Sequence, residues 1–327
     1  MNLFITGAAG FIGSAYVRHV LNTSDDHVTV YDALTYAGNP ENLRELQSDP
    51  RFRFVHADIC DREAVAAAMD GHDAVVHFAA ESHVDRSIVD PDAFVRTNCD
   101  GTNVLCDVAR RVGVERFVHI STDEVYGSID EGSFSETSPL SPRSPYSAAK
   151  AGSDLIALSY HTTFGLPVVI TRSSNQFGPR QFPEKVIPLF VTNLLDGHKV
   201  PLYGDGGNVR DWLYVEDNVT AVDLVRRQGA VGEVYNIGAH NELTNVDLTH
   251  RLLALCGRDE SFIERVADRP GHDRRYSITT DRVAALGWAT RWSLDDALAA
   301  TVDWYRANRS WWEPLKARAA FDRLPTR

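Results

Sequence analysis

The stretch Gly7-Ala8-Ala9-Gly10-Phe11-Ile12-Gly13 decides the fold of this 327-residue chain. It joins a short apolar run, Leu3–Thr6, to an apolar pattern of helical period over Ile12–Leu21. Glycine permits a tight turn, close approach of the backbone to a ligand and close packing of helix on strand. The turn therefore predicts a helix N-terminus that binds a dinucleotide pyrophosphate. The spacing is G-x-x-G-x-x-G rather than G-x-G-x-x-G, so ordinary loop geometry is the alternative interpretation.

Downstream of this turn, apolar runs continue to alternate with helical patterns, which is typical of a parallel sheet wound with helices. The further strands are expected at Val28–Asp32, Phe52–His56, Ala74–Phe78, Phe117–Ser121 and Val168–Thr171. The further helices are expected at Arg62–Met69, Asp92–Val112, Tyr146–Phe164, Glu184–Leu195, Asp217–Arg227, Asn245–Cys256 and Ser293–Asn308. The fold class is thus α/β, a Rossmann-type doubly wound parallel sheet with a smaller C-terminal substrate-binding lobe. We expect residues 1–172 to form the dinucleotide-binding domain, with a later contribution near 210–238, and residues 173–327 mainly the lobe.

Composition limits the partners of the chain. The formal charge of −12 argues against nucleic acid, because phosphate backbones need clustered positive charge. No apolar run approaches the roughly 20 residues that span a bilayer, and the first residues lack the basic segment of a signal peptide. The four cysteines have neither CxxC nor metal-ligand spacing, which indicates reduced, buried thiols and no metal. We therefore expect a cytoplasmic protein with a small-molecule substrate.

Acidic residues after the second and third strands indicate which dinucleotide binds. Asp32 lies about 20 residues beyond Gly13, where a carboxylate accepts hydrogen bonds from the adenosine ribose. A 2′-phosphate would be repelled there, which favours NAD over NADP. Asp58 and Ile59 lie where an adenine edge would rest, although Asp58 is equally placed to cap the helix that begins near Asp61.

Tyr146 and Lys150 lie four residues apart at the start of a predicted helix, so both side chains lie on one face. An ammonium beside a phenol favours the phenolate, and we expect it to lower the pKa of Tyr146 and make it a base for a sugar or alcohol hydroxyl. Thr122-Asp123-Glu124 follows the fifth strand, at the edge where substrate would lie. Two acids whose pKa values are split by their surroundings supply a proton donor and a proton acceptor. A solvated turn at the strand end is the alternative.

These motifs resemble the extended short-chain dehydrogenase/reductase superfamily, and within it the dTDP-glucose 4,6-dehydratases. The resemblance extends from Met1 to about Asn308. Besides the glycine turn, Thr122–Gly127 and Tyr146–Lys150, it is carried by Phe78–Asp85, Pro183–Lys185, Tyr203–Gly206, Arg210–Trp212 and Arg269–Tyr276. The acid pair is its most discriminating part, because related epimerases usually have non-acidic residues there.

The resemblance implies a role for each catalytic residue. Tyr146, with Lys150 beside it, takes the proton of the sugar 4-hydroxyl while a hydride leaves C4 for NAD. Glu124 then removes the C5 proton, and Asp123, kept protonated, donates to the departing 6-hydroxyl. Thr122 bonds near O4. The hydride returns to C6, so the product is a 4-keto-6-deoxy sugar nucleotide.

The resemblance also implies the binding residues. The cofactor-binding set is Gly7, Gly10, Phe11, Ile12, Gly13, Asp32, Asp58, Ile59, Phe78, Ala79, Ala80, Ser82, Thr97, Tyr146, Lys150 and Gln176. The substrate-binding set is Ser82, His83, Thr122, Asn175, Lys185, Tyr203, Arg210, Asn245, Arg269 and His272. Arg210 and Arg269 suit a pyrophosphate because an Arg fork matches its oxygens. A surface or inter-loop ion pair is the alternative for both.

Departures from the family pattern fall outside the Tyr/Lys pair and the acids. Ala8 stands where many relatives have glycine, Gln176 and Phe177 replace a usual Asn-Tyr, and Arg180 follows Pro179 where an aromatic is common. These departures bear on the expected nucleotide preference more than on the expected reaction. The helices over Asp92–Val112 and Tyr146–Phe164 resemble those that pair in superfamily dimers, so a homodimer is expected, with plain core packing as the alternative. Trp311 and Trp312 are expected to pack on the C-terminal lobe.

Three other functions remain open at this point. A nucleotide-sugar 4-epimerase would share the cofactor turn and the Tyr/Lys pair, but it needs neither acid. A silent NAD-responsive regulator would be expected to lose Tyr146, Lys150 or an acid. An NADP-linked reductase is opposed by Asp32.

Overall fold

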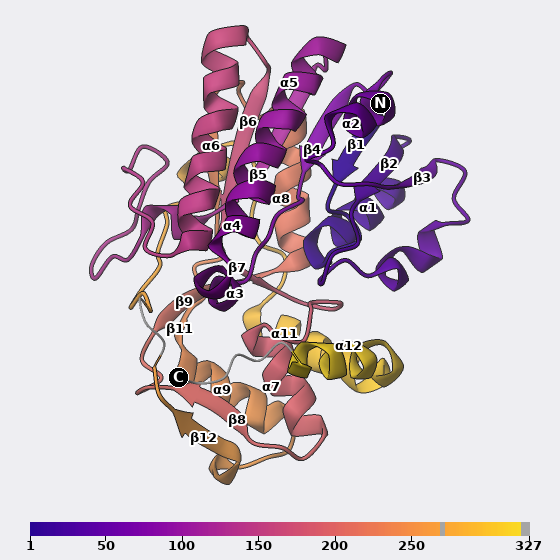
Figure 1. Ribbon diagram of the computed structural model, residues 1–327. Coiled ribbons are helices and arrows are strands. Elements are labelled where there is room, and N and C mark those ends of the chain that lie inside the picture. Colours follow the sequence, from indigo (N-terminus) through magenta and orange to yellow (C-terminus); the bar gives the residue numbers. More distant parts are fainter. Residues whose placement is uncertain (269–271, 322–327) are drawn as a thin grey trace.

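The computed structural model describes residues 1–268 and 272–321 (Figure 1). Its centre is a parallel sheet of seven strands in the order β10-β6-β5-β4-β1-β2-β3. This arrangement confirms the predicted doubly wound parallel sheet. The strands of the sheet are β1 (Asn2–Thr6), β2 (His27–Asp32), β3 (Phe52–His56), β4 (Ala74–His77), β5 (Arg116–Thr122), β6 (Val168–Ser173) and β10 (Val234–Ile237).

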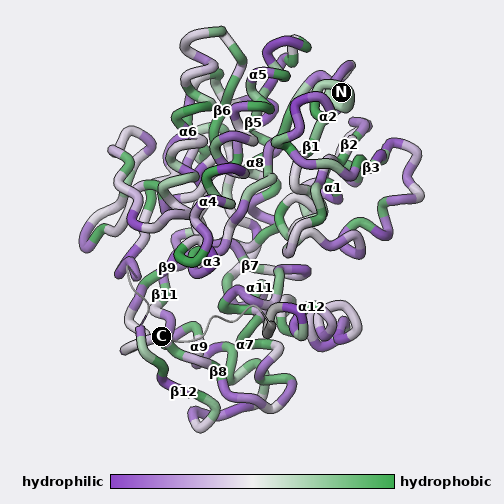
Figure 2. The backbone as a smooth tube through the Cα atoms, in the orientation of Figure 1, coloured by the Kyte–Doolittle hydropathy of each residue, from purple (hydrophilic) through white to green (hydrophobic). Residues whose placement is uncertain are grey.

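Helices cover both faces of this sheet (Figure 1). One face carries α1 (Phe11–Thr23) and α8 (Val215–Gln228), and the other carries α2 (Arg62–Met69), α5 (Thr102–Val112) and α6 (Pro145–Phe164). Side chains of a strand alternate between the two layers, so Leu3 and Ile5 lie in the first core and Phe4 in the second. Because helices cover both faces, the inner strands are largely apolar, and green segments of the tube run through the sheet in Figure 2.

The helix expected over Asp92–Val112 is not continuous. The structure has α4 (Pro91–Phe94), then a π-helical turn, η2 (Val95–Gly101), and then α5. The side chain of Asn98 in this turn accepts a hydrogen bond from Glu81 N and donates one to Glu81 O. These bonds to the loop after β4 hold the turn toward the sheet edge, and they account for the local widening of the helix, which often accompanies a functional site.

The C-terminal lobe lies beyond the carboxyl edge of the sheet, at the bottom of Figure 1. It has its own apolar core. Its smaller sheets are β11-β9-β7 and β12-β8, from β7 (Asn175–Phe177), β8 (Val200–Tyr203), β9 (Val209–Tyr214), β11 (Glu242–Thr244) and β12 (Ile263–Val266). Its main helices are α7 (Val186–Leu195), α9 (Asn245–Leu255), α11 (Leu294–Ala307) and α12 (Arg309–Phe321). Shorter helical segments of the chain are η1 (Pro40–Leu46), α3 (Val84–Val89), η3 (Asp123–Tyr126), η4 (Glu260–Phe262) and α10 (Asp281–Ala285).

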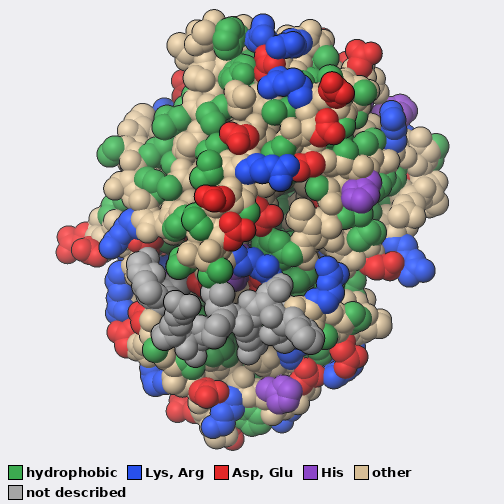
Figure 3. Space-filling view, in the orientation of Figure 1, with side chains coloured by type: hydrophobic (Ala, Val, Ile, Leu, Met, Phe, Trp, Pro, Cys, Tyr) green, Lys and Arg blue, Asp and Glu red, His purple; other side chains and the backbone are tan. Residues whose placement is uncertain are grey.

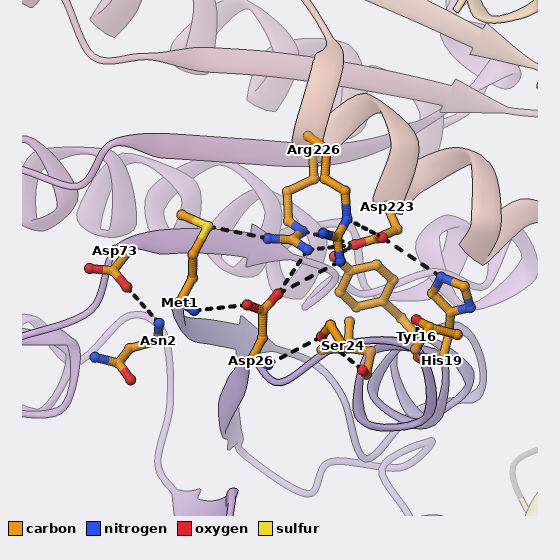
Figure 4. A network of polar contacts seen from close by, with 12 residues as sticks. Met1, Asn2, Tyr16, His19, Ser24, Asp26, Asp73, Asp223 and Arg226 are labelled. Atoms are coloured by element: carbon orange, nitrogen blue, oxygen red, sulfur yellow. Dashed lines mark hydrogen bonds and ion pairs between the residues drawn. The ribbon is translucent and has the colours of Figure 1, made fainter. Parts of the chain in front are cut away.

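A polar network fastens α8 to the first strands and helix of the chain (Figure 4). The guanidinium of Arg226, whose side chain is 2% exposed, lies 3.0 Å from Asp26 Oδ2 and 2.8 Å from Asp223 Oδ1. The hydroxyl of Tyr16 donates to the same Asp223 oxygen at 3.2 Å. Helix α8 is therefore bound by buried charges to the residue that precedes β2, 200 positions earlier in the sequence.

Acidic and basic side chains are interspersed over the face drawn in Figure 3. Within the part of the chain that the structure describes, no helix is both long enough and apolar enough to cross a membrane.

Candidate active site

A cleft of about 460 Å³ opens at the carboxyl edge of the large sheet, where ligands bind in doubly wound folds. Its walls come from the turn after β1 and from the ends of β2, β4, β5 and β6. Every residue of the predicted cofactor-binding set lines it, from Gly7 to Gln176. The predicted catalytic residues Thr122, Asp123, Glu124, Tyr146 and Lys150 line the same cleft.

Glycine is required at two positions of the first turn for different steric reasons. Gly7 has φ of +70°, and a Cβ there would lie 2.4 Å from Ala79 N, so no side chain fits. A Cβ on Gly13 would lie 2.7 Å from Ala8 Cα, which would separate helix from turn. Gly10 precedes α1 as its N-cap and supplies no side-chain hydrogen bond to the free N–H groups of the first helical turn. These N–H groups face a cleft and suit the oxygens of a pyrophosphate.

Asp32, which is expected to bind the adenosine ribose, lines one side of the cleft. Its two carboxylate oxygens accept hydrogen bonds from Ala9 N at 2.9 Å and Leu34 N at 2.8 Å, so the side chain is fixed to the glycine turn. Asp58 also lines the cleft, and it pairs with Arg96 at 3.1 Å. The cap of α2 is Asp61, which bonds Glu63 N and Ala64 N, so Asp58 does not have the capping role that was its alternative.

Buried polar atoms without a protein partner are concentrated around this cleft. They are Tyr36 Oη, Ser121 Oγ, Asp123 Oδ2, Ser174 Oγ, Asn175 Oδ1, Gln181 Oε1 and Glu184 Oε1, all on residues that line it. A buried polar group without a hydrogen bond costs about 1–3 kcal/mol, so such a cluster is a place where a polar ligand completes the bonding. Together with the uncapped start of α1, these atoms fit a dinucleotide with a polar substrate beside it.

Tyr146 and Lys150 occupy the first turns of α6. Pro145 stands at the first helical position, and Ser144 forms a capping box with Ser147, so the sequence sets where this helix begins. Both functional side chains are buried, with 9% of Tyr146 and 5% of Lys150 exposed. The ammonium of Lys150 donates to the carbonyl oxygen of Ile120 at 2.6 Å, which fixes it against the end of β5.

The expected lowering of the tyrosine pKa by the lysine is wrong for the protein alone. Burial, followed by the charge of Glu124, raises the pKa of Tyr146 well above its usual value. Burial also lowers the pKa of Lys150 to about 8, against the opposing charge of Asp154. Burial therefore favours the neutral phenol in the protein alone, whereas a positive charge in the cleft would favour the phenolate.

The acid pair begins η3 directly after β5. Thr122 is the N-cap of this segment, and its hydroxyl accepts from Glu124 N at 3.2 Å and donates to Asp123 Oδ1 at 3.3 Å. Burial, the carboxylate of Glu124 and that of Asp211 raise the pKa of Asp123 well above its usual range, while Arg210 opposes them. Asp123 is 3% exposed, and these surroundings favour the protonated form that a proton donor needs.

The substrate-binding set divides into two groups. Ser82, Thr122, Asn175 and Lys185 line the cleft, and Lys185 Nζ donates to Ser82 O at 2.7 Å. The remaining described members do not line it: His83, Tyr203, Arg210, Asn245 and His272. Arg269 lies outside the described residues.

The residues outside the cleft belong mostly to the lobe, around β8, β9 and the start of α9. Arg210 is 5% exposed, donates to the carbonyl oxygen of Asp273 at 2.9 Å, and lies 4.1 Å over the ring of Tyr276. Of the two alternatives, a surface ion pair does not fit this burial, and the contact of Arg210 with the neighbouring loop is to a backbone carbonyl oxygen. The ring centroids of His272 and Tyr203 are 6.2 Å apart, so these two residues share one corner of the lobe.

Several lining residues were missed from sequence, namely Tyr36, Glu81, Ser121, Ser174 and Gln181. For most of them a signal was available. Tyr36, Glu81 and Ser174 come shortly after β2, β4 and β6, and Ser121 lies near the end of β5, so topology brings them to one edge. Gln181 follows no strand of the large sheet, and only the folded loop places it in the wall.

Comparison with known proteins agrees with this geometry. A family model described as GDP-mannose 4,6 dehydratase matches residues 4–301. The chain is 57% identical to a dTDP-glucose 4,6-dehydratase of Streptomyces antibioticus over 334 residues, which covers 100% of this chain and 99% of that one.

Solved structures give the same result. The dTDP-glucose 4,6-dehydratase of Streptomyces venezuelae, crystallised with NAD and a further ligand, superposes with a TM-score of 0.95 at 55% identity, covering 96% of this chain and 100% of that one. A UDP-glucose 4-epimerase of Thermus thermophilus in complex with NAD has a TM-score of 0.88 at 32% identity, covering 94% and 100%. The predicted resemblance is confirmed, and the chain belongs to the family of the dTDP-glucose 4,6-dehydratases.

Proposed function

We propose that this protein is an NAD-dependent hydro-lyase that converts dTDP-glucose to dTDP-4-keto-6-deoxyglucose. The observation that carries the proposal is the presence of two acids, Asp123 with a raised pKa and Glu124, in one cleft with Tyr146 and Lys150. Oxidation of an alcohol needs only the Tyr/Lys pair. Loss of water from the adjoining carbons needs both a base and an acid as well.

The residues that would hold NAD are those of the glycine turn, Asp32 and the walls after β4 and β6. When bound, NAD⁺ supplies a hydride acceptor that later returns the hydride, and it brings a positively charged ring into the cleft. Tyr146 then takes the proton from the sugar 4-hydroxyl. Lys150, fixed to Ile120 O, keeps a positive charge behind the phenol.

Glu124 removes the proton from C5, which the new 4-ketone has made acidic. Asp123 gives its proton to the 6-hydroxyl, so that the oxygen leaves as water. When C6 then regains a hydride, Glu124 returns its proton to C5, which completes the 4-keto-6-deoxy product. Both acids lie at the start of η3. Thr122 stabilises the first turn of this segment because its hydroxyl accepts a hydrogen bond from Glu124 N. Thr122 also lines the cleft, where its hydroxyl bonds near O4 of the sugar.

A 4-epimerase is the nearest alternative, since such an enzyme has the same fold. It would need no group with the raised pKa of Asp123, because epimerisation at C4 eliminates nothing. The desolvated acid beside Tyr146 therefore favours the dehydratase.

The test is to incubate the purified protein with dTDP-glucose, UDP-glucose and GDP-mannose and to measure product mass. Loss of 18 mass units, the mass of one water, from dTDP-glucose is the expected result, with no net consumption of added NAD. A product of unchanged mass but altered configuration would replace the proposal with epimerisation. Elimination only from another nucleotide sugar would retain the reaction and change the substrate.

A homodimer is supported by exposed apolar side chains on neighbouring helices. Ile88 and Val89 on α3, Val95 on η2 and Leu155 on α6 are 47%, 54%, 52% and 59% exposed. Both α3 and η2 pack against α6, so the elements that carry these side chains are neighbours. A second copy covering this surface would remove them from water. Sedimentation velocity would test this, and a monomer at micromolar concentration would refute it.

The four free thiols of the chain support a reducing compartment such as the cytoplasm.

A further inference from the structure

We propose that Trp311 is a positioning residue for the dinucleotide turn, and that the helix pair α11–α12 limits the rate at which NAD leaves. The inference rests on the proposed function for its purpose, since a cofactor that is restored in each turnover has no need to dissociate. Its structural basis is a chain of hydrogen bonds from α12 to the glycine turn, and the first of these bonds joins residues 269 positions apart.

The first bond runs from the indole Nε1 of Trp311 to Asn42 Oδ1, at 3.0 Å. Asn42 lies in η1 and is 1% exposed, so this oxygen has little access to water. The other end of the same amide, Nδ2, donates to the carbonyl oxygen of Ala9 at 2.9 Å. Trp311 thereby orients the amide that fixes Ala9.

Ala9 lies inside the dinucleotide turn, between Gly7 and Gly10. Its carbonyl also accepts from Asn39 N at 3.0 Å, and its N–H donates to Asp32 Oδ2 at 2.9 Å. The same peptide segment therefore connects the pyrophosphate turn with the carboxylate expected to bind the ribose. A shift of Asn42 displaces both contacts at once.

The same helix pair also holds the opposite wall of the cleft. Tyr305 on α11 donates from its hydroxyl to the carbonyl oxygen of Gln181 at 2.5 Å, and Gln181 lines the cleft. Trp304, Tyr305 and Trp311 pack edge to face, with the Trp304 and Trp311 rings 5.0 Å apart. This aromatic cluster is thus hydrogen-bonded to two walls of the cleft. Moving the walls apart requires one of these two hydrogen bonds to break.

The neighbouring loop adds a second attachment between these walls. Arg180 has φ of +68°, a conformation that side chains other than glycine rarely adopt. Its guanidinium bonds Glu45 on η1 at 3.0 Å and lies 5.6 Å from the Trp304 ring centroid. This loop is therefore held between η1 and the same aromatic cluster.

The test is the rate at which bound NAD⁺ exchanges with labelled NAD⁺ in the holoprotein, followed by rapid filtration. Trp311→Phe keeps the ring packing and removes the donor, so exchange should be about three- to tenfold faster, the effect of one lost hydrogen bond. The matched control is Trp288→Phe, whose indole donates to Thr220 Oγ1 at 3.0 Å on α8, away from the cleft. Its exchange rate should equal that of the unmodified protein.

Further variants distinguish a positioning role of Trp311 from a general loss of packing around the cleft. In an Asn42→Ala background, Trp311→Phe should change the exchange rate no further. At saturating NAD⁺, kcat of Trp311→Phe should remain within twofold of that of the unmodified protein.

Unchanged exchange in Trp311→Phe, or equal acceleration in Trp288→Phe, would overturn the proposal. If Trp311→Phe does not fold, Asn42→Asp tests the same path, since it keeps the acceptor for Trp311 and removes the donor to Ala9. NAD exchange is measured without sugar, so a failure of the proposed reaction on dTDP-glucose would be seen separately.

Discussion

The ammonium of Lys150 donates its hydrogen bond to the carbonyl oxygen of Ile120, 2.6 Å away at the end of β5. This bond holds a buried positive charge under the reacting edge of the sheet, although burial lowers the pKa of the lysine to about 8. The protein keeps this charge at a cost in folding stability. The effect of Lys150 on the free energy of unfolding can therefore be measured separately from its effect on catalysis.

Replacing Lys150 by Met should stabilise the NAD-free protein and abolish activity. A lysine with a pKa of about 8 when folded and about 10.5 when unfolded destabilises the native state below pH 8 by about 3 kcal/mol. The unfolded state binds more protons between these values, so this penalty fades as pH rises from 8 to 10.5. Since the Ile120 carbonyl loses its partner, we expect a net gain of about 1–3 kcal/mol at pH 7. Urea unfolding at pH 7 and pH 10 measures it.

The control for this experiment is Lys199→Met, at an exposed lysine. It should leave the free energy of unfolding unchanged at both pH values. A Lys150→Met protein less stable than the parent at pH 7 would show that the hydrogen bond to Ile120 outweighs the cost of burying the charge.

Asp123→Asn should slow water elimination from dTDP-glucose by about 10²- to 10⁴-fold, because the amide has no proton to give the leaving oxygen. Oxidation at C4, measured as the absorbance of reduced cofactor in a single turnover, should continue. The pKa of Asp123 is raised on folding, so its burial lowers stability above the pH at which the unfolded carboxyl ionises. The amide variant should therefore be no less stable at pH 7. Unimpaired elimination would contradict the role of Asp123 as acid.

Gly7→Ala should eliminate NAD binding and destabilise the fold by about 2–4 kcal/mol, since strain at φ +70° adds to a clash with Ala79 N at 2.4 Å. Gly71→Ala is the matched control. Gly71 has φ of +76° and nothing within 4 Å of the added Cβ, so only the conformational cost of about 1 kcal/mol remains. Thermal unfolding and NAD titration of both variants distinguish steric exclusion from backbone strain.

Asp154→Asn should destabilise the protein by about 3–5 kcal/mol at pH 7, because it leaves the buried guanidinium of Arg172 without its partner at 2.8 Å. Burial alone would raise the pKa of Asp154, but the hydrogen bond from His119 and the charge of Arg172 lower it to about 2. The stabilisation is complete above pH 4 and is lost as pH falls toward 2.

Urea unfolding of the Asp154 variant at pH 7 and pH 3 checks this, and the difference from the parent should shrink at the lower pH. Asp205→Asn removes an exposed ion pair with Arg274 and serves as control, with no measurable change at either pH. A constant difference between parent and Asp154→Asn would show that the loss is steric rather than electrostatic.

The cofactor side of the site was predictable because strand ends determine it. In a parallel sheet, each residue at the carboxyl end of an apolar run is brought to the same edge, so Asp32, Ala79 and Thr122 converge although they are distant in sequence. The strand β3 and the helix α2 have the predicted bounds, and most other elements of the first half differ from their predicted bounds by one or two residues.

The lobe and the pKa values were not predictable in the same way. Strands β7, β9 and β11 have three to six residues and pair across long loops, so no local period marks them. The pKa of Tyr146 depends on how much water reaches it, which pairing with Lys150 in sequence does not reveal. The contact of Trp311 with Asn42 likewise depends on how the lobe folds back on the sheet.

The position of β10 has a consequence for synthesis on the ribosome. This strand forms the outer edge of the seven-stranded sheet beside β6, with Ile237 level with Ser173, yet it ends 64 residues after that partner. A nascent chain that has emerged only to the end of β6 leaves the row of N–H and C=O groups on that strand unpaired. Such an edge readily joins other strands, so the half-made protein is exposed to aggregation for the interval needed to translate the next segment. The late strand thus makes protection by chaperones most valuable in a narrow window of translation.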